Sequence, residues 1–166
     1  MSIQWAVLEN GVLSPIKIIV FYHKELSSLP DQSELLARFR RELASCTHVM
    51  AFNLKYDAQW LEESGFNLEH LSFIDPMITE YVCARGRSDI SFKLADTCKR
   101  YKIEEKGEIF SKYPDTQISE MPLEEVISYA VGDIKCLYEL YLAQEKRLSK
   151  DSYVGLRKTI QMSWDF

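Results

Sequence analysis

The feature that most constrains the fold is the alternation of short apolar runs with longer amphipathic segments. Residues 3–8 and 16–22 are rich in β-branched and aromatic residues and flank the turn signal Glu9-Asn10-Gly11, which predicts a hairpin. A short strand is predicted at "HVMAF" and another before Asp75. Helices are predicted near 31–45, around Asp57 up to Gly65, after Asp75 with Pro76 at the first helical position, near 90–101, and from Pro122 onward. A polar connection is predicted over 102–121, before the last of these helices. The order β-β-α-β-α-α-α-α predicts an α/β domain with a mixed sheet and helices packed on it.

The length and net charge of the chain limit the functions that are expected of it. The chain has 166 residues, which suits a single core. Its formal net charge of −5 counts against extended electrostatic binding of a nucleic acid duplex. A small site in which divalent cations neutralise phosphates locally stays compatible with that charge.

The cysteines and the hydropathy pattern point to a reduced, non-membrane setting. Cys46, Cys83, Cys98 and Cys136 are widely spaced and form no Cys-x-x-Cys pair, so zinc binding is not expected. No signal peptide and no apolar run long enough to cross a membrane is found in the sequence. We therefore expect a cytoplasmic protein that makes no membrane contact.

The stretch "AFNLKYDAQWLEESGF" (51–66) places two polar side chains where a strand is predicted to enter a helix. Asn53 ends the strand-like segment, and Asp57 follows one turn into the helix. A carboxylate at such a junction is well placed to hold a cation over the end of a sheet. An ordinary solvated acid in the first helical turn is the competing interpretation, and the residues alone favour it.

A second pair of polar residues lies on the last helix, in "YAVGD". Tyr129 and Asp133 are four residues apart, which places the phenol and the carboxylate on one helical face. Taken alone, a buried Tyr hydroxyl bonded to an exposed acid accounts for this spacing. Asn-x-x-x-Asp at a junction together with a distant Tyr-x-x-x-Asp is a far more specific combination.

These motifs resemble the proofreading 3′–5′ exonuclease domain of family A DNA polymerases, a DnaQ-like member of the ribonuclease H-like fold. "NLKYD" (53–57) resembles the second exonuclease motif, and "YAVGD" (129–133) the third. "IDPMITEYV" (74–82) and "KLADTCKRYKI" (93–103) resemble the segments between them. The similarity extends from about residue 2 to about residue 145.

The resemblance implies two-metal hydrolysis of phosphodiesters, with Mg²⁺ or Mn²⁺ as cofactor. Asp57 and Asp133 would be metal ligands, and Tyr129 would orient the attacking water. Asn53 would lie near the terminal sugar-phosphate, and Phe110 is a weak candidate for stacking on the terminal base, with core packing as the alternative. The substrate would be a single-stranded DNA 3′ end, and the product a nucleoside monophosphate.

One part of the family pattern has no counterpart. The first motif, Asp-x-Glu on the opening strand, is absent where it belongs, since "VLENG" (7–11) has Val7 at the Asp position. We therefore expect a ribonuclease H-like mixed sheet whose first central strand is missing from this chain. An upstream segment, a partner chain or the tail of this chain would supply it, and a polymerase domain is a further candidate partner. Residues 1–148 would form the exonuclease-like domain, and 149–166 a tail resembling the start of a polymerase domain.

Two functions remain open from the sequence. The first is a 3′–5′ exonuclease of the proofreading type, with its activity in doubt because the first carboxylate motif is absent. The second is a catalytically inactive nucleic-acid-binding or scaffold module of the same fold. A sequence cluster of basic residues could contact phosphates, although a solvated basic face is the favoured account; its members are Arg85, Arg87, Lys93, Lys99 and Arg100.

Overall fold

The structure is a computed structural model that describes residues 2–29, 31–85, 87, 89–103 and 109–150. The chain divides into two compact units. The first comprises Met1–Glu42 and Lys106–Lys135, and the second comprises Leu43–Glu105 and Cys136–Phe166. Of the predicted tail (149–166), residues 151–166 lie outside the described residues, and residues 149 and 150 belong to the last helix.

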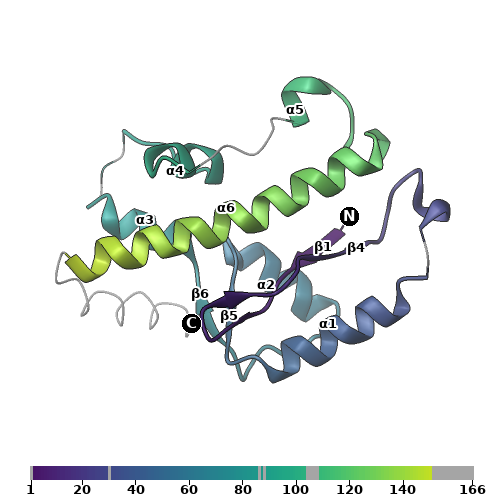
Figure 1. Cartoon of the computed structure of the whole chain (residues 1–166), viewed down its shortest axis with the longest axis horizontal. Helices are drawn as coiled ribbons and strands as arrows, with labels where there is room; N and C mark the ends of the chain where they lie inside the picture. Colours follow the sequence, from purple (N-terminus) through teal and green to yellow (C-terminus); the bar gives the residue numbers. More distant parts are fainter. Residues whose placement is uncertain (1, 30, 86, 88, 104–108, 151–166) are drawn as a thin grey trace. The chain divides into compact units, whose positions relative to one another are not determined.

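The first unit begins with the predicted hairpin. Strand β1 (Ser2–Trp5) pairs antiparallel with β4 (Lys17–Val20), as Figure 1 shows. Between them, β2 (Leu8–Glu9) pairs with β3 (Val12–Leu13) around Asn10-Gly11. Both turn residues have positive φ, at 51° and 79°, as the tight turns that match strand twist require.

Helix α1 (Ser33–Ser45) packs against this hairpin through an aromatic contact and a carboxylate. The rings of Trp5 and Phe39 meet edge to face, with centroids 5.0 Å apart. Glu42 accepts hydrogen bonds from Trp5 Nε1 at 2.7 Å, Arg38 Nε at 2.9 Å and Lys17 Nζ at 3.2 Å. Desolvation acts to raise the pKa of Glu42, but these three donors outweigh it and lower that pKa to about 2.

The segment 109–121 corrects an expectation. The sequence predicts a polar connection over 102–121, whereas the structure shows α5 (Ile109–Lys112) and a 3₁₀ turn, η2 (Ile118–Glu120), within it. Ile109 and Met121 are buried in one cluster with Val126 of α6. The apolar side chains at its two ends therefore anchor this segment in the first unit.

The second unit contains a parallel βαβ unit. Strands β5 (His48–Met50) and β6 (Ser72–Ile74) pair in parallel, and α2 (Leu54–Glu63) is the crossover between them. Parallel strands need such a crossover because the end of one strand and the start of the next lie at opposite edges of the sheet. Gly65 ends the α2 segment at φ 80°, as predicted for a left-handed cap.

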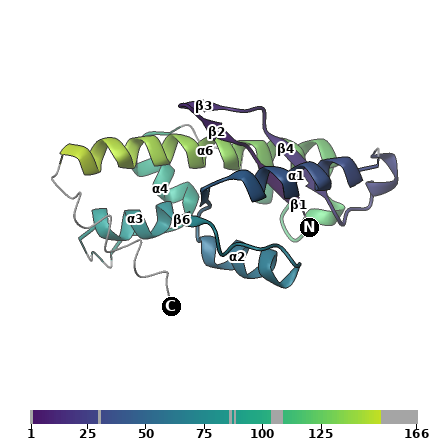
Figure 2. The ribbon, with the colours of Figure 1, turned by 90° about the horizontal axis from the view of Figure 1, so that it is seen from below.

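Two further helices of this unit pack beside the C-terminal half of α6 (Leu123–Lys150), as Figure 2 shows. They are α3 (Pro76–Cys83) and α4 (Leu94–Arg100). Cys98 and Leu140 are buried together, and Gln144 donates to the carbonyl oxygen of Pro76 at 2.9 Å. Within the described residues, no helix is both long enough and apolar enough to span a bilayer.

The α/β class predicted from the sequence is confirmed, and the ribonuclease H-like mixed sheet remains a prediction. In the described part of the chain, the strands form three two-stranded sheets, two antiparallel and one parallel. The predicted long helix after Pro122 is also confirmed, and it contributes residues to both units.

Candidate active site

The carboxyl end of the parallel strand pair is organised by Asp75. Its carboxylate accepts hydrogen bonds from the backbone N–H of Met77 at 2.8 Å, Asn53 at 3.0 Å and Leu54 at 2.9 Å. The first is the predicted N-cap of α3. The other two satisfy the N-terminus of α2, so one side chain that is 4 % exposed caps two helices.

Asn53 adopts a left-handed conformation, with φ 61° and ψ 46°, at the start of α2. Its side chain makes no capping hydrogen bond to the helix. Because Asp75 binds the backbone N–H groups, the Asn53 amide is not used as the helix cap. That arrangement is compatible with a contact between this side chain and a substrate.

Asp57 lies in the first turn of α2, on its exposed side. Desolvation by the surrounding protein raises the pKa of Asp57, and the negative charge of Asp75 raises it further. The pKa of Asp75 is also raised, because its burial outweighs the N–H donors that lower it. The negative charge of Asp75 thus disfavours ionisation of Asp57, and a cation bound beside both carboxylates would offset this repulsion.

Tyr129 and Asp133 lie one turn apart on the part of α6 that belongs to the first unit. Both side chains are half-buried. Tyr129 packs against the cluster of Ile109, Met121 and Val126. The candidate water-orienting phenol is therefore held by apolar packing.

Phe110 contacts Tyr129 edge to face, with ring centroids 5.7 Å apart and an interplanar angle of 83°. Its side chain remains 52 % exposed. Phe110 is therefore not a core residue. Its ring contacts the phenol of Tyr129, and about half of its surface is accessible.

The predicted site residues thus fall into two groups. Asn53 and Asp57 lie together with Asp75 in the second unit, and Phe110, Tyr129 and Asp133 lie in the first. That Asp57 and Asp133 share a divalent ion remains a prediction. Among the described residues, no three His, Cys, Asp or Glu side chains gather as a metal-binding group would.

The side-chain oxygens of the predicted ligands suit the metal that the resemblance implies. Asp57 and Asp133 offer carboxylate oxygens, the ligands that hard cations such as Mg²⁺ prefer. Mg²⁺ typically takes one or two protein carboxylates and completes its shell with water and substrate phosphate. Each of the two carboxylates is therefore chemically suited to such an ion, while two ions would need further carboxylates.

The sequence predicts only one role for Asp75, as the N-cap of α3. Its bonds to residues 53 and 54 span 22 and 21 positions, and local sequence patterns carry no information on such contacts. The available signal is its position directly after a strand that pairs in parallel with the strand preceding Asn53.

Both motifs lie within a region of the chain that matches a known protein family. A family model described as a 3′–5′ exonuclease matches residues 17–149, a range that contains every predicted site residue. No curated protein matches the chain significantly. Because the model covers most of the sequence, the chain belongs to the 3′–5′ exonuclease family of family A DNA polymerases.

Proposed function

We propose that this chain is a 3′–5′ exonuclease that removes nucleoside monophosphates from single-stranded DNA 3′ ends by hydrolysis. The observation that carries the proposal is the family match over residues 17–149, which includes both the "NLKYD" and the "YAVGD" segments. The local structure at "NLKYD" supports it, because Asp57 lies where two parallel strands end.

The proposed architecture is a ribonuclease H-like sheet to which β5, α2 and β6 contribute a parallel βαβ unit. Residues 1–148 form the exonuclease domain, and 149–166 form a tail that resembles the start of a polymerase domain. The Asp-x-Glu motif comes from a further segment or from a partner chain, which also provides the first central strand.

Each residue has a defined role in this proposal. Asp57 and Asp133 hold Mg²⁺ or Mn²⁺, and two ions are held once further carboxylates complete the site. When bound, the metal supplies positive charge that neutralises the reacting phosphate.

The remaining residues position the reactants. The Tyr129 hydroxyl forms a hydrogen bond with the attacking water and so aligns this water with the phosphorus. Asn53 binds the sugar-phosphate of the terminal nucleotide, and the exposed face of Phe110 contacts its base.

The test is a 5′-labelled single-stranded oligonucleotide incubated with the purified chain and Mn²⁺. We expect a ladder of products shortened from the 3′ end, which is lost in EDTA and in the Asp133→Ala variant. Glu139→Gln on an exposed part of the same helix is the matched control and should leave the ladder unchanged. Binding without shortening would contradict the nuclease assignment and would instead indicate an inactive nucleic-acid-binding module.

A further inference from the structure

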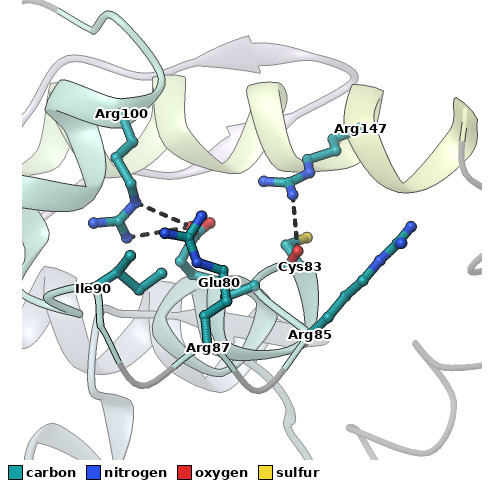
Figure 3. A pocket seen from close by; sticks show the side chains of 8 residues that line it. Glu80, Cys83, Arg85, Arg87, Ile90, Arg100 and Arg147 are labelled. Atoms are coloured by element: carbon teal, nitrogen blue, oxygen red, sulfur yellow. Dashed lines mark hydrogen bonds and ion pairs between the residues drawn. The ribbon is translucent and has the colours of Figure 1, made fainter.

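The second unit contains a cavity lined by four arginines (Figure 3). Arg100 of α4 and Arg147 of α6 point toward α3, and Arg85 and Arg87 extend from the segment that follows α3. Its volume of about 320 Å³ lies at the lower end of the range for small-molecule sites. Glu80 is the acidic side chain in this lining, so four cations face one anion.

The charge of Glu80 is already used within the protein. Its side chain is 3 % exposed, and it accepts hydrogen bonds from Arg100 Nε at 3.3 Å and Nη2 at 3.2 Å. Gln144 donates to its second oxygen at 3.3 Å. Glu80 therefore fixes Arg100 in position through one oxygen, while its other oxygen is bound by Gln144.

Arg147 makes its described hydrogen bonds to uncharged acceptors. It donates to the carbonyl oxygen of Cys83 at 2.8 Å and to the hydroxyl oxygen of Tyr101 at 3.0 Å. Neither bond neutralises the guanidinium. Arg147 is therefore held in position at the cavity while it keeps its positive charge.

Arg87 is paired with Asp89, but this pair lies at the surface. Its two hydrogen bonds measure 2.9 and 2.7 Å, and the two side chains are 62 % and 67 % exposed. Surface pairs of this kind contribute little stability, so an incoming anion can compete for the guanidinium. Planar guanidinium groups match the oxygens of a phosphate well.

An aromatic pair with one exposed member, Tyr81, comes from the same part of the chain that lines the cavity. Tyr81 of α3 is 58 % exposed, and its ring lies 5.0 Å from that of Phe92 at an interplanar angle of 36°. Phe92 directly follows Ser91, whose carbonyl oxygen accepts from Arg100 at 2.6 Å. Cations that bind a backbone phosphate beside aromatic rings that stack on bases are typical of single-strand binding sites.

We propose that this arginine cavity binds a backbone phosphate of single-stranded nucleic acid, with a neighbouring base stacked on Tyr81 or Phe92. The inference rests on the proposed function, since it assigns an additional contact to the same substrate. It uses residues separate from Asp57, Tyr129 and Asp133, so binding here is measurable without catalysis.

The experiment measures fluorescence anisotropy of labelled single-stranded oligothymidylate with the full chain in EDTA, over a range of salt concentrations. The variant Arg85→Gln/Arg87→Gln should weaken binding by about tenfold and lower the steepness of the salt dependence by about 0.7 per lost phosphate contact. Arg40→Gln/Arg41→Gln, which removes two exposed arginines of α1, is the matched control and should bind as the wild type does. Tyr81→Ala should weaken binding about fivefold or more without changing the salt dependence.

Two further arms separate the alternatives. Inorganic phosphate and thymidine monophosphate are titrated against the wild type. If the cavity is a site for free phosphate, it binds these two probes, and the cavity variants keep the wild-type affinity for the oligonucleotide. That outcome, or an equal loss in the control variant, would overturn the proposal. Thermal unfolding of each variant shows that a loss of binding does not reflect a loss of fold.

The outcome is independent of nuclease activity. If the wild type binds the oligonucleotide through the cavity but never shortens it with Mn²⁺, the cavity is supported and the proposed function fails. If it shortens the oligonucleotide while the cavity variants bind normally, the proposed function stands and this inference fails.

Discussion

The two segments that carry the candidate carboxylates are built in different ways. Asp57 follows a junction whose geometry depends on Asp75, 18 positions further along the chain. Asp133 follows Tyr129 by one turn of a continuous helix, so helix geometry alone sets their relation. One half of the candidate site is thus held by tertiary hydrogen bonds and the other by local backbone structure.

This difference indicates where each half is vulnerable. A single substitution at Asp75 removes the acceptor for three backbone donors, whereas no single side chain maintains the spacing of Tyr129 and Asp133. We therefore expect the Asp57 segment to be sensitive to distant changes and the Asp133 segment to respond mainly to changes in its own side chains.

The largest effect is expected from removing either candidate ligand. Asp57→Asn and Asp133→Asn should each lower the rate of 3′-end shortening by a factor of about a thousand or more, because each removes charge that stabilises the transition state. Single-turnover assays with Mn²⁺ measure this loss. Glu63→Gln, an exposed change on α2, serves as the control for Asp57. A full rate in either Asn variant would remove that residue from the site.

The next largest effect is expected at Asp75. Asp75→Ala should lower the free energy of unfolding by about 2–4 kcal/mol, because it leaves buried backbone donors at two helix starts without an acceptor. Asp75→Asn retains one acceptor oxygen and should cost less. Denaturant unfolding measures both variants. An unchanged stability in Asp75→Ala would show that the junction does not depend on this carboxylate.

A smaller effect on rate is expected at Tyr129. Tyr129→Phe keeps the ring that packs against Phe110 and removes only the hydroxyl, so the rate should fall about tenfold to a hundredfold while the unfolding midpoint stays constant. The rate constant kcat and the thermal unfolding midpoint are measured on the same preparation. A fall in kcat that is accompanied by a fall in the unfolding midpoint would indicate a structural role instead.

Glu42 offers a contrast with Asp75 in the sign of its pH dependence. The pKa of Glu42 is lowered to about 2 in the fold, so its stabilising effect is complete above the unfolded value of 4.5 and is lost as the pH falls toward 2. The pKa of Asp75 is raised, so its ionisation opposes folding as the pH rises above 3.8.

Glu42→Gln should therefore cost about 1–2 kcal/mol at neutral pH, allowing for solvent screening of this group. The loss should shrink as the acidity increases toward pH 2. Urea unfolding of variant and wild type between pH 7 and pH 2 tests this convergence. A constant difference across that range would contradict the pKa assignment.

The smallest effect is expected at Phe110. Phe110→Ala removes an edge-to-face contact of a half-exposed ring, which should cost less than about 1 kcal/mol of stability. The loss of binding free energy for oligonucleotide 3′ ends should be larger than this loss of folding stability. A normal affinity would show that Phe110 supports Tyr129 alone.

Local features of this fold were predictable from the sequence, and long-range ones were not. The Asn10-Gly11 turn, the Gly65 cap and the Asp75 cap each depend on a few neighbouring residues, and all three are confirmed. The bonds from Asp75 to residues 53 and 54 join positions far apart in the chain, and no local pattern predicts them. The single turn α5 also escaped prediction, since four residues are too few to show helical periodicity.

The basic residues illustrate the same limit. Of the five basic residues that lie close together in the sequence, Arg85, Arg87 and Arg100 line one cavity, whereas Lys93 and Lys99 are not part of its lining. Arg147 joins them from a helix 47 positions beyond Arg100, which only the packing of α6 beside α3 and α4 reveals. Lys93, in contrast, occupies the N-cap position of α4.

In the proposed site Asp57 and Asp133 bind the same divalent ion, and paramagnetic broadening by Mn²⁺ tests this shared binding most directly. In an isotope-labelled chain titrated with Mn²⁺, the backbone amide signals around Asp57 and those around Asp133 should disappear together with one dissociation constant. Asp57→Asn should abolish the broadening at Asp133 as well. Broadening at one site that leaves the other sharp, or two unrelated dissociation constants, would contradict the shared ion.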